Sequence, residues 1–147
     1  MKVLIDTNII LDVLEKREPF FEDSYRIIQL GLEGDIDTIM SAGAVTDVYY
    51  LIRQFLKDPV KARESIFVLS NFIKICSSAS DDITKALVLF IPDFEDAVLA
   101  VIAKREKADF IITRNEEDFV NSPVPAKTPA LFLREYKTWY KYGIIQK

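Results

Sequence analysis

Short apolar runs that end in polar residues alternate along the chain with segments in which apolar residues recur every three or four positions. The first run, Val3-Leu4-Ile5, ends at Asp6 and is typical of a buried strand. Further on, Phe21, Tyr25 and Ile28 have the spacing of one helix face. This alternation predicts strands that are each followed by one or two helices.

Four strands and a short fifth are predicted at residues 2–6, 35–40, 72–76, 109–113 and 124–126. Helices are predicted at residues 8–15, 20–32, 44–56, 58–71, 80–89, 93–107 and 128–140. The expected helix caps are Asp58, Ser80 and Asp93, since short polar side chains stabilise the first turn of a helix. This order favours an α/β fold, a three-layer sandwich in which a parallel four- or five-stranded sheet has helices on both faces. Residues 1–147 are expected to form a single domain.

The composition is that of a folded protein with a sizeable core. The chain has 147 residues, and half of them are apolar, which argues against disorder. No apolar run approaches the ~18 residues of a membrane helix, and Asp6 interrupts the apolar core that an export signal would need. Cys76 is the only cysteine, which excludes an internal disulfide and a cysteine-based zinc site. We therefore expect a soluble, cytoplasmic protein with no membrane partner.

The sequence contains no histidine, which excludes histidine general bases, serine–histidine triads and imidazole metal ligands. Any catalysis must use carboxylates, hydroxyls, amides, lysines or arginines, and hard oxygen ligands suit Mg²⁺ or Mn²⁺. The net charge of −4 counts against a nucleic-acid substrate, because nucleic-acid binders are usually basic. From residue 126 onward, however, only Glu135 is acidic, while the basic residues are Lys127, Arg134, Lys137, Lys141 and Lys147.

Polar side chains follow the predicted strands at their carboxyl ends, which lie at one edge of a parallel sheet. Asp6 follows the first strand, and Asp47 lies in the helix after the second. Thr113 and Asn115 follow the fourth strand, and the helix leading into it begins with Asp93, Glu95 and Asp96. Carboxylates placed together repel one another, and a cation relieves that repulsion. The sequence therefore predicts a divalent metal site that activates water for phosphodiester hydrolysis.

Four motifs stand out in this order: Asp6-Thr7-Asn8, Thr46-Asp47-Val48-Tyr49-Tyr50, Asp93-Phe94-Glu95-Asp96-Ala97 and Ile112-Thr113-Arg114-Asn115-Glu116-Glu117-Asp118-Phe119. They resemble the motifs of the PIN domain family, and within it those of the VapC-like toxins of bacterial and archaeal toxin–antitoxin pairs. The resemblance covers nearly the whole chain. It implies a ribonuclease that depends on Mg²⁺ or Mn²⁺, is often a homodimer and is held inactive by a cognate antitoxin.

The resemblance also implies roles for individual residues. The catalytic residues would be Asp6, Asp47, Asp96 and Asn115, and the metal ligands Asp6 and Asp96, with Asp93 as a neighbouring candidate. Asp47 is one methylene shorter than the Glu that is usual in the family, and Asn115 is neutral where the family often has Asp. One well-held metal ion is therefore expected rather than two. The supporting residues would be Asn8, Thr113 and Asp118.

Each of these residues also has a purely structural interpretation. Asp6 would cap a helix or take part in an ion pair, while Asp93 and Asp96 would cap a helix or balance its dipole. Thr113 and Asn115 would only organise the turn after the fourth strand.

Three further charged residues lie in or between the motifs. Arg114 is the basic residue best placed to contact a phosphate, and the competing interpretation is an exposed surface arginine. Asp12 is expected to face solvent or to pair with a lysine. Glu95 is expected to be a solvated helix residue.

Three functions are compatible with these residues. The first is a metal-dependent endoribonuclease that hydrolyses phosphodiester bonds of RNA as the toxin of a toxin–antitoxin pair. The second is a phosphatase of the haloacid dehalogenase-like group with Asp6 as its nucleophile, although Asn8 stands where that group usually has a second Asp. The third is a binding module in which a PIN fold has lost its catalytic activity.

Overall fold

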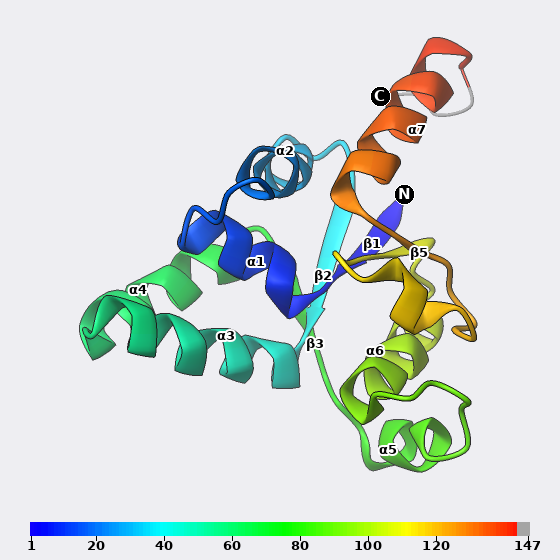
Figure 1. The fold of residues 1–147 in the computed structure, drawn as a ribbon, viewed down its shortest axis with the longest axis horizontal. Helices are drawn as coiled ribbons and strands as arrows, with labels where there is room; N and C mark the ends of the chain where they lie inside the picture. Colours follow the sequence, from blue (N-terminus) through cyan, green and yellow to red (C-terminus); the bar gives the residue numbers. More distant parts are fainter. Residues whose placement is uncertain (144–147) are drawn as a thin grey trace.

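The computed structural model describes residues 1–143 and contains a five-stranded sheet. The strands are β1 (Lys2–Ile5), β2 (Asp37–Ser41), β3 (Lys74–Cys76), β4 (Phe110–Ile112) and β5 (Ala126–Lys127). Their order is β3-β2-β1-β4-β5, with β1 at the centre, and all neighbouring pairs are parallel (Figure 1). The predicted parallel sheet is therefore confirmed, including its short fifth strand.

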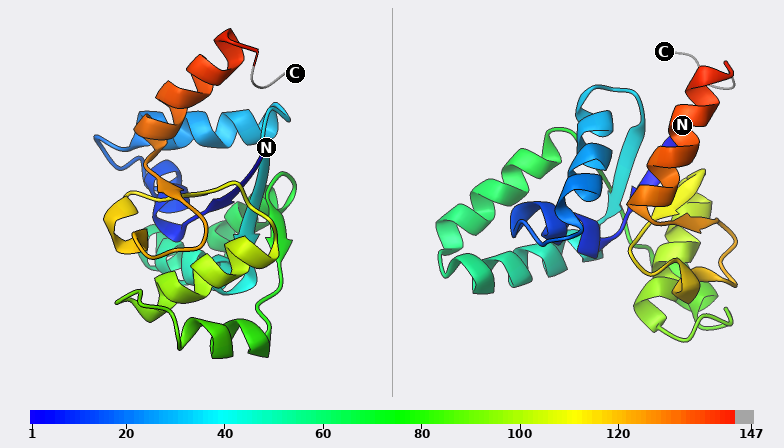
Figure 2. Two further views of the ribbon diagram at one scale, coloured as in Figure 1. Left: turned by 90° about the vertical axis from the view of Figure 1, so that its right-hand side faces the viewer. Right: turned by 45° about the horizontal axis from the view of Figure 1, so that its top comes forward.

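Helices cover both faces of this sheet (Figures 1 and 2). They are α1 (Thr7–Leu14), α2 (Phe21–Leu32), α3 (Ala42–Leu56), α4 (Pro59–Ser70), α5 (Ser80–Ala86), α6 (Phe94–Arg105), the 3₁₀ helix η1 (Glu116–Phe119) and α7 (Pro129–Lys141). Helices α1 to α4 and α7 pack on one face, and α5, α6 and η1 pack on the other. The predicted three-layer α/β sandwich is confirmed.

The central strand β1 contributes to both layers of the core, because successive side chains of a strand point to opposite faces. Val3 and Ile5 pack with the helices of the first face, and Leu4 packs with α5 and α6 on the other. All three side chains are fully buried. A strand buried on both faces needs a continuous apolar run, so the first polar residue, Asp6, marks the end of the strand.

The direction in which the strands are added reverses at the centre of the sheet. From β1 the chain moves outward to β2 and β3, and it then returns to the other side of β1 at β4. Right-handed crossovers place the helices on opposite faces when the direction reverses, as α1 to α4 and α5 to α6 show (Figure 1). The carboxyl ends of β1 and β4 therefore flank the switch point, where open α/β sheets bind ligands.

Two of the three predicted helix caps are confirmed. The Asp58 and Asp93 carboxylates each accept the backbone N–H groups two and three residues further on, at 2.9 and 3.2 Å and at 2.8 and 3.2 Å respectively. The prediction for Ser80 is wrong, because Ser80 is already the first residue of α5. The carboxylate of Asp82 instead accepts the N–H of Ala79 at 2.8 Å and closes that helix start.

The remaining differences concern the ends of elements. The fifth strand lies at residues 126–127 rather than 124–126, and the segment after the fourth strand contains the 3₁₀ helix η1. Lys147, one of the basic residues counted near the end of the sequence, lies outside the described residues. None of the helices described in residues 1–143 has the length and apolar character that crossing a lipid bilayer requires.

Shortening Leu4 tests the central position of β1. Leu4→Ala would leave a cavity between β1 and α6, because the side chain is fully buried in that layer. We expect a loss of about 2–5 kcal/mol in the free energy of unfolding, measured by urea denaturation. Leu87→Ala is the matched control, since Leu87 is 69% exposed and should change stability by less than about 0.5 kcal/mol. Equal losses in the two variants would contradict this account of the core.

Candidate active site

Asp6 is fixed at the carboxyl end of β1 by both its backbone and its side chain. Its N–H donates to the carbonyl of Ile112 at 3.0 Å, which continues the pairing of β1 with β4. Its Oδ2 accepts the hydroxyl of Thr113 at 2.7 Å and the side-chain amide of Asn8 at 2.8 Å. Asp6 occupies the N-cap position of α1, but its side chain makes no capping hydrogen bond. The interpretation of Asp6 as a helix cap is therefore wrong, and its carboxylate is held across the switch point by β4.

Asp6 faces a hollow of about 580 Å³ at the switch point. The hollow lies between the ends of β1 and β4 and the starts of α1, α6 and η1, and polar groups dominate its lining. The lining residues are Asp6, Thr7, Asn8, Leu11, Arg17, Leu51, Pro92, Asp93, Glu95, Asp96, Thr113, Arg114, Asn115 and Asp118. The structure thus brings together every site residue predicted from the sequence except Asp47.

Asp47 borders this hollow without lining it. It is exposed in the second turn of α3. Its charge nevertheless acts on the hollow, because Asp47 is one of the groups that raise the pKa of Glu95. Asp47 therefore belongs to the electrostatic surroundings of the site in this structure.

The two acids predicted as metal ligands both resist ionisation. Burial is the main cause that raises the pKa of Asp96 from 3.8 to about 7, and nearby negative charges add to it, from Asp6, Asp93, Asp118 and Glu95. Burial also raises the pKa of Asp6, against the hydrogen bonds from Thr113 and Asn8. Both carboxyl groups would be stabilised as anions by a cation in the hollow.

The first turn of α6 has a structural role as well. Asp93 caps the helix through one carboxylate oxygen, so the capping interpretation of this residue is confirmed. Its charge also contributes to the raised pKa values of Asp96 and Glu95. Asp93 therefore serves the helix and the electrostatics of the hollow together.

The turn after β4 is organised by local hydrogen bonds that also involve the site. The Thr113 hydroxyl donates to Asp6 and accepts the N–H of Asn115 at 3.2 Å. The carbonyl of Asn115 accepts the N–H of Asp118 at 3.1 Å. The side chains of Asn115 and Asp118 are exposed at the hollow. The structural interpretation of Thr113 and Asn115 is thus compatible with a place in the site.

Arg114 stands at the edge of the hollow and is held by three contacts. Its Nη1 lies 3.4 Å from Oδ1 of Asp12. The carbon of its guanidinium lies 4.6 Å from the centroid of the Phe20 ring. Its backbone N–H donates to the side-chain oxygen of Asn8 at 3.4 Å. The side chain is 27% exposed, which leaves part of the guanidinium free to meet a ligand.

The prediction for Asp12 is wrong. The residue is fully buried, pairs with Arg114 rather than with a lysine, and accepts the hydroxyl of Ser24 at 3.0 Å. Burial raises the pKa of Asp12, and these two partners oppose the rise. Asp12 lies three residues after the buried Ile9 on α1, and that spacing is the sequence signal for its burial.

Two charged residues of the hollow are absent from the site predicted from the sequence. Arg17 lies in the turn after α1, with its guanidinium 2.6 Å from the carboxylate of Glu15. Glu95 is exposed, as expected, but it also lines the hollow, and partial burial is the first cause of its raised pKa. No motif points to Arg17, because only the chain reversal between α1 and α2 brings it back to the site.

The chemistry of the donor groups fits a hard divalent cation. Within residues 1–143, no three acidic side chains converge closely enough to hold a metal ion by themselves. Mg²⁺ typically takes only one or two carboxylates and keeps several waters. Asp6 and Asp96 supply two carboxyl groups on one hollow, and the hollow has room for water. The residues present therefore suit one ion that is held largely through water.

Comparison with protein families agrees with this arrangement. A family model described as "PIN domain" matches residues 2–117. The chain belongs to the PIN domain family. The matched range runs from β1 into η1 and includes every predicted site residue except Asp118.

Individual proteins and structures are also similar to this PIN domain. The protein named Ribonuclease VapC1 of Aquifex aeolicus (strain VF5) is 27% identical over 142 residues, which are 93% of this chain and 96% of the relative. The crystal structure of VapBC2 from Rickettsia felis, bound to a DNA fragment from its promoter, contains a chain with a TM-score of 0.69 and 18% identity, covering 87% of this chain and 98% of that one. A toxin–antitoxin complex from Klebsiella pneumoniae contains one with a TM-score of 0.63 and 20% identity, covering 86% and 97%. The two structures support the fold.

The raised pKa of Asp96 makes the stability of the metal-free PIN domain depend on pH. In the unfolded chain this carboxyl loses its proton near pH 3.8, whereas in the folded protein it keeps the proton up to about pH 7. The folded state therefore binds more protons between these values, and stability falls as the pH rises through this range. We expect Asp96→Asn, which stays neutral, to be more stable than the wild type by about 1–4 kcal/mol at pH 8 and nearly equal to it at pH 4.

Urea denaturation in the presence of a chelator, at several pH values, measures this difference. Asp81→Asn is the control, because the Asp81 side chain is 68% exposed and its pair with Lys85 lies on the surface. A stability difference between Asp96→Asn and the wild type that stays constant from pH 4 to pH 8 would contradict the prediction.

Proposed function

We propose that this protein is a metal-dependent endoribonuclease and the toxin of a toxin–antitoxin pair. The observation that carries the proposal is the position of Asp6 and Asp96 on one polar hollow at the switch point of the sheet. Membership of the PIN domain family and the similarity to a protein named as a ribonuclease support the same activity. The substrate class follows from the chemistry, since carboxylates with a divalent cation are suited to phosphodiester hydrolysis.

In the proposed site, Asp6 and Asp96 hold one Mg²⁺ or Mn²⁺ ion, with Asp93 as a further candidate ligand. When bound, the ion supplies a water of lowered pKa and offsets negative charge on the phosphate oxygens. Thr113 and Asn8 keep the Asp6 carboxylate oriented by donating hydrogen bonds to one of its oxygens. Both of these bonds are made to Oδ2, so Oδ1 is the oxygen that would bind the ion in the proposed site.

The remaining predicted residues surround this centre. Asn115 and Asp118 line the hollow and would orient water through their side-chain oxygens. Asp47 adds negative charge at the border, which favours retention of a cation. Arg114 and Arg17 carry guanidinium groups, which suit the paired oxygens of a phosphate.

The proposal includes a protein partner. A chain in a solved toxin–antitoxin complex has a similar fold, which supports a cognate antitoxin for this protein. Large apolar side chains are exposed along α3 and α4, where a partner or a second copy would bury them, and they include Tyr50, Phe55, Phe67 and Val68. Homodimer formation stays a prediction, and the cytoplasm remains the expected compartment for an enzyme that cleaves RNA.

The two alternative functions are each disfavoured by one feature of the site. A phosphatase of the haloacid dehalogenase-like group usually needs a second Asp two positions after its nucleophile, and here that position is Asn8, whose side chain donates to Asp6. A catalytically inactive binding module would need no cation. The pKa of Asp96 is raised partly by neighbouring negative charges, however, and a bound cation would relieve that repulsion. The ribonuclease is therefore favoured over both.

Cleavage of RNA tests the proposed activity directly. We expect the purified protein to cleave single-stranded RNA with Mg²⁺ or Mn²⁺ and to stop when the ion is removed by a chelator. Asp6→Asn and Asp96→Asn should each lower kcat/KM by about 10²-fold or more, because each removes a ligand charge worth several kcal/mol. Thr113→Val should lower it by about 10–100-fold, as expected for a residue that orients a ligand.

The control variant for the cleavage assay is Glu117→Gln, which removes an exposed acid of η1 that does not line the hollow. It should leave kcat/KM unchanged. Cleavage that survives both Asp6→Asn and Asp96→Asn would sink the proposal and indicate a contaminating nuclease. A phosphorylated Asp6 trapped with phosphomonoesters would instead favour the phosphatase.

Metal binding has its own readout, which does not depend on cleavage. A cation that binds only the folded protein stabilises it, by about 2.7 kcal/mol at a concentration of 100 Kd. We expect Mg²⁺ to raise the Tm at pH 8, and less so at pH 5, where the proton on Asp96 competes with the ion. Asp96→Asn should lose most of this increase, whereas Asp81→Asn should keep it. A Tm that does not change on addition of Mg²⁺ at any pH would favour the inactive binding module.

A further inference from the structure

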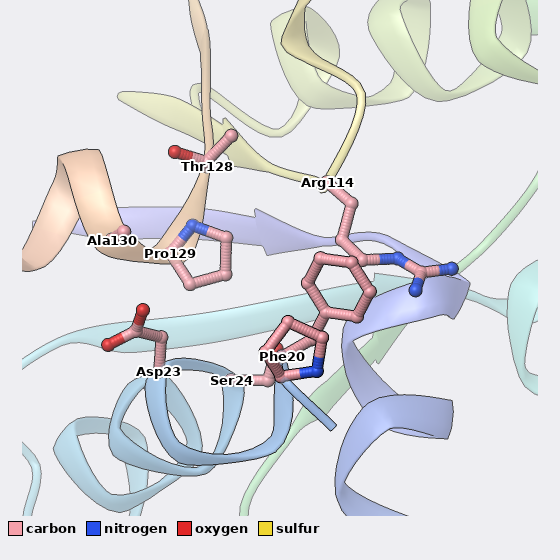
Figure 3. A pocket seen from close by; sticks show the side chains of 8 residues that line it. Phe20, Asp23, Ser24, Arg114, Thr128, Pro129 and Ala130 are labelled. Atoms are coloured by element: carbon pink, nitrogen blue, oxygen red, sulfur yellow. The ribbon is translucent and has the colours of Figure 1, made fainter. Parts of the chain in front are cut away.

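A second hollow lies beside the candidate active site, between the starts of α2 and α7 (Figure 3). It measures about 240 Å³, and we call it the Phe20 pocket. Its lining consists of Pro19, Phe20, Asp23, Ser24, Arg114, Thr128, Pro129 and Ala130. Among the described residues, Arg114 alone belongs to the linings of both hollows. One arginine side chain therefore separates this pocket from the site of the proposed chemistry.

The Phe20 pocket has flat apolar walls. Phe20 and Arg114 lie against each other on one side, and Thr128, Pro129 and Ala130 lie on the other (Figure 3). The Phe20 side chain is 42% exposed, although a ring of this size is usually buried when it serves the core. Such walls suit a flat ring that stacks between them.

The charges of the pocket favour a neutral occupant. Asp23 supplies a carboxylate, which points from α2 toward Pro129 and Ala130 (Figure 3). A phosphate inside the pocket would meet this negative charge. The volume is also below the ~300–1,000 Å³ of pockets for drug-sized ligands, so a single ring system fits better than a larger molecule.

We propose that the Phe20 pocket binds one unstacked base of the RNA strand, on the nucleotide next to the phosphate held in the active-site hollow. Proteins recognise single-stranded RNA by stacking splayed bases on aromatic rings or arginine planes and by hydrogen bonds to the base edges. A base and its own phosphate are one sugar apart, and the two hollows are one side chain apart. This inference rests on the proposed ribonuclease function and adds a determinant of its sequence preference.

The Asp23 carboxylate determines which bases the pocket favours. A carboxylate accepts hydrogen bonds but donates none, so it favours an edge that carries an amino group. Cytosine, adenine and guanine each carry an exocyclic amino group, whereas uracil has only carbonyl oxygens at the corresponding positions. At the position that occupies the pocket, a base with an amino group is therefore favoured over uracil, and Asp23→Asn, which both donates and accepts, relaxes the preference.

The test uses a single-stranded RNA that the wild type cleaves at one site. A series of substrates carries one abasic nucleotide at each position around that site, and kcat/KM is measured for each. Loss of the stacked base should lower kcat/KM at one position by about 5- to 150-fold, which corresponds to the 1–3 kcal/mol of one stacked base. In Phe20→Ala the same abasic substrate should perform as well as the intact one, because the stacking partner is already gone.

Two further variants make the result specific. Ala130→Leu fills the pocket from an exposed helix position and should abolish the same discrimination without truncating a side chain. Tyr142→Ala removes another exposed ring, 70% exposed at the end of α7 and in the lining of neither hollow, and should keep the wild-type discrimination.

The outcomes separate this inference from the function on which it rests. If the protein cleaves RNA but kcat/KM is the same for every abasic substrate, the base pocket is overturned while the proposed ribonuclease function is retained. Discrimination that survives both Phe20→Ala and Ala130→Leu would overturn it too and would assign the base to another surface. A wild-type protein that cleaves no RNA would reject the proposed function and the pocket with it.

Discussion

The hydrogen bond from the Thr113 hydroxyl to the Asp6 carboxylate joins the two strands on which the candidate site is built. Residues 6 and 113 are 107 positions apart in sequence, and only the neighbouring positions of β1 and β4 bring them within 2.7 Å. The chain leaves these two paired strands toward opposite faces of the sheet, so a crevice opens beyond their carboxyl ends, and the polar hollow lies there. The position of Asp6, the turn after β4 and the opening of the hollow all depend on this contact.

The site gains its chemistry at the expense of stability. Burial raises the pKa of both Asp6 and Asp96, and neighbouring acids add to the rise at Asp96, so the ionised forms of both are disfavoured in the folded protein. A chain selected only for stability would place apolar or paired residues there. The arrangement is consistent when a cation occupies the hollow, because the charges that repel one another in its absence then attract the ion. In the proposed function, the residues that destabilise the metal-free fold are therefore the same ones that would bind the ion.

Much of the fold and of the candidate site could be predicted from the sequence, but for different physical reasons. The alternation of apolar runs and helical spacing determines the three layers, and the rule that parallel strands end at one edge is enough to group Asp6 with Thr113 and Asn115. Local rules worked for Asp58 and Asp93 but failed for Ser80, where the neighbouring Asp82 competes for the same helix start. The surroundings of Asp12 depend on a contact with Arg114 that spans most of the chain, and periodicity carries no information about such a partner.

The arrangement of arginines answers the objection that a protein with a net charge of −4 is a poor nucleic-acid binder. Acidic side chains concentrate in the hollow, where the proposed cation would offset them, while Arg17 and Arg114 lie at its edge. Arg114 is held by a buried carboxylate and an aromatic ring, and removing one partner of such a buried pair leaves an uncompensated charge. Its donors are thus fixed before a ligand arrives, which lowers the entropy lost on binding. For such a site, the position and prior ordering of a few arginine side chains matter more than the net charge of the chain.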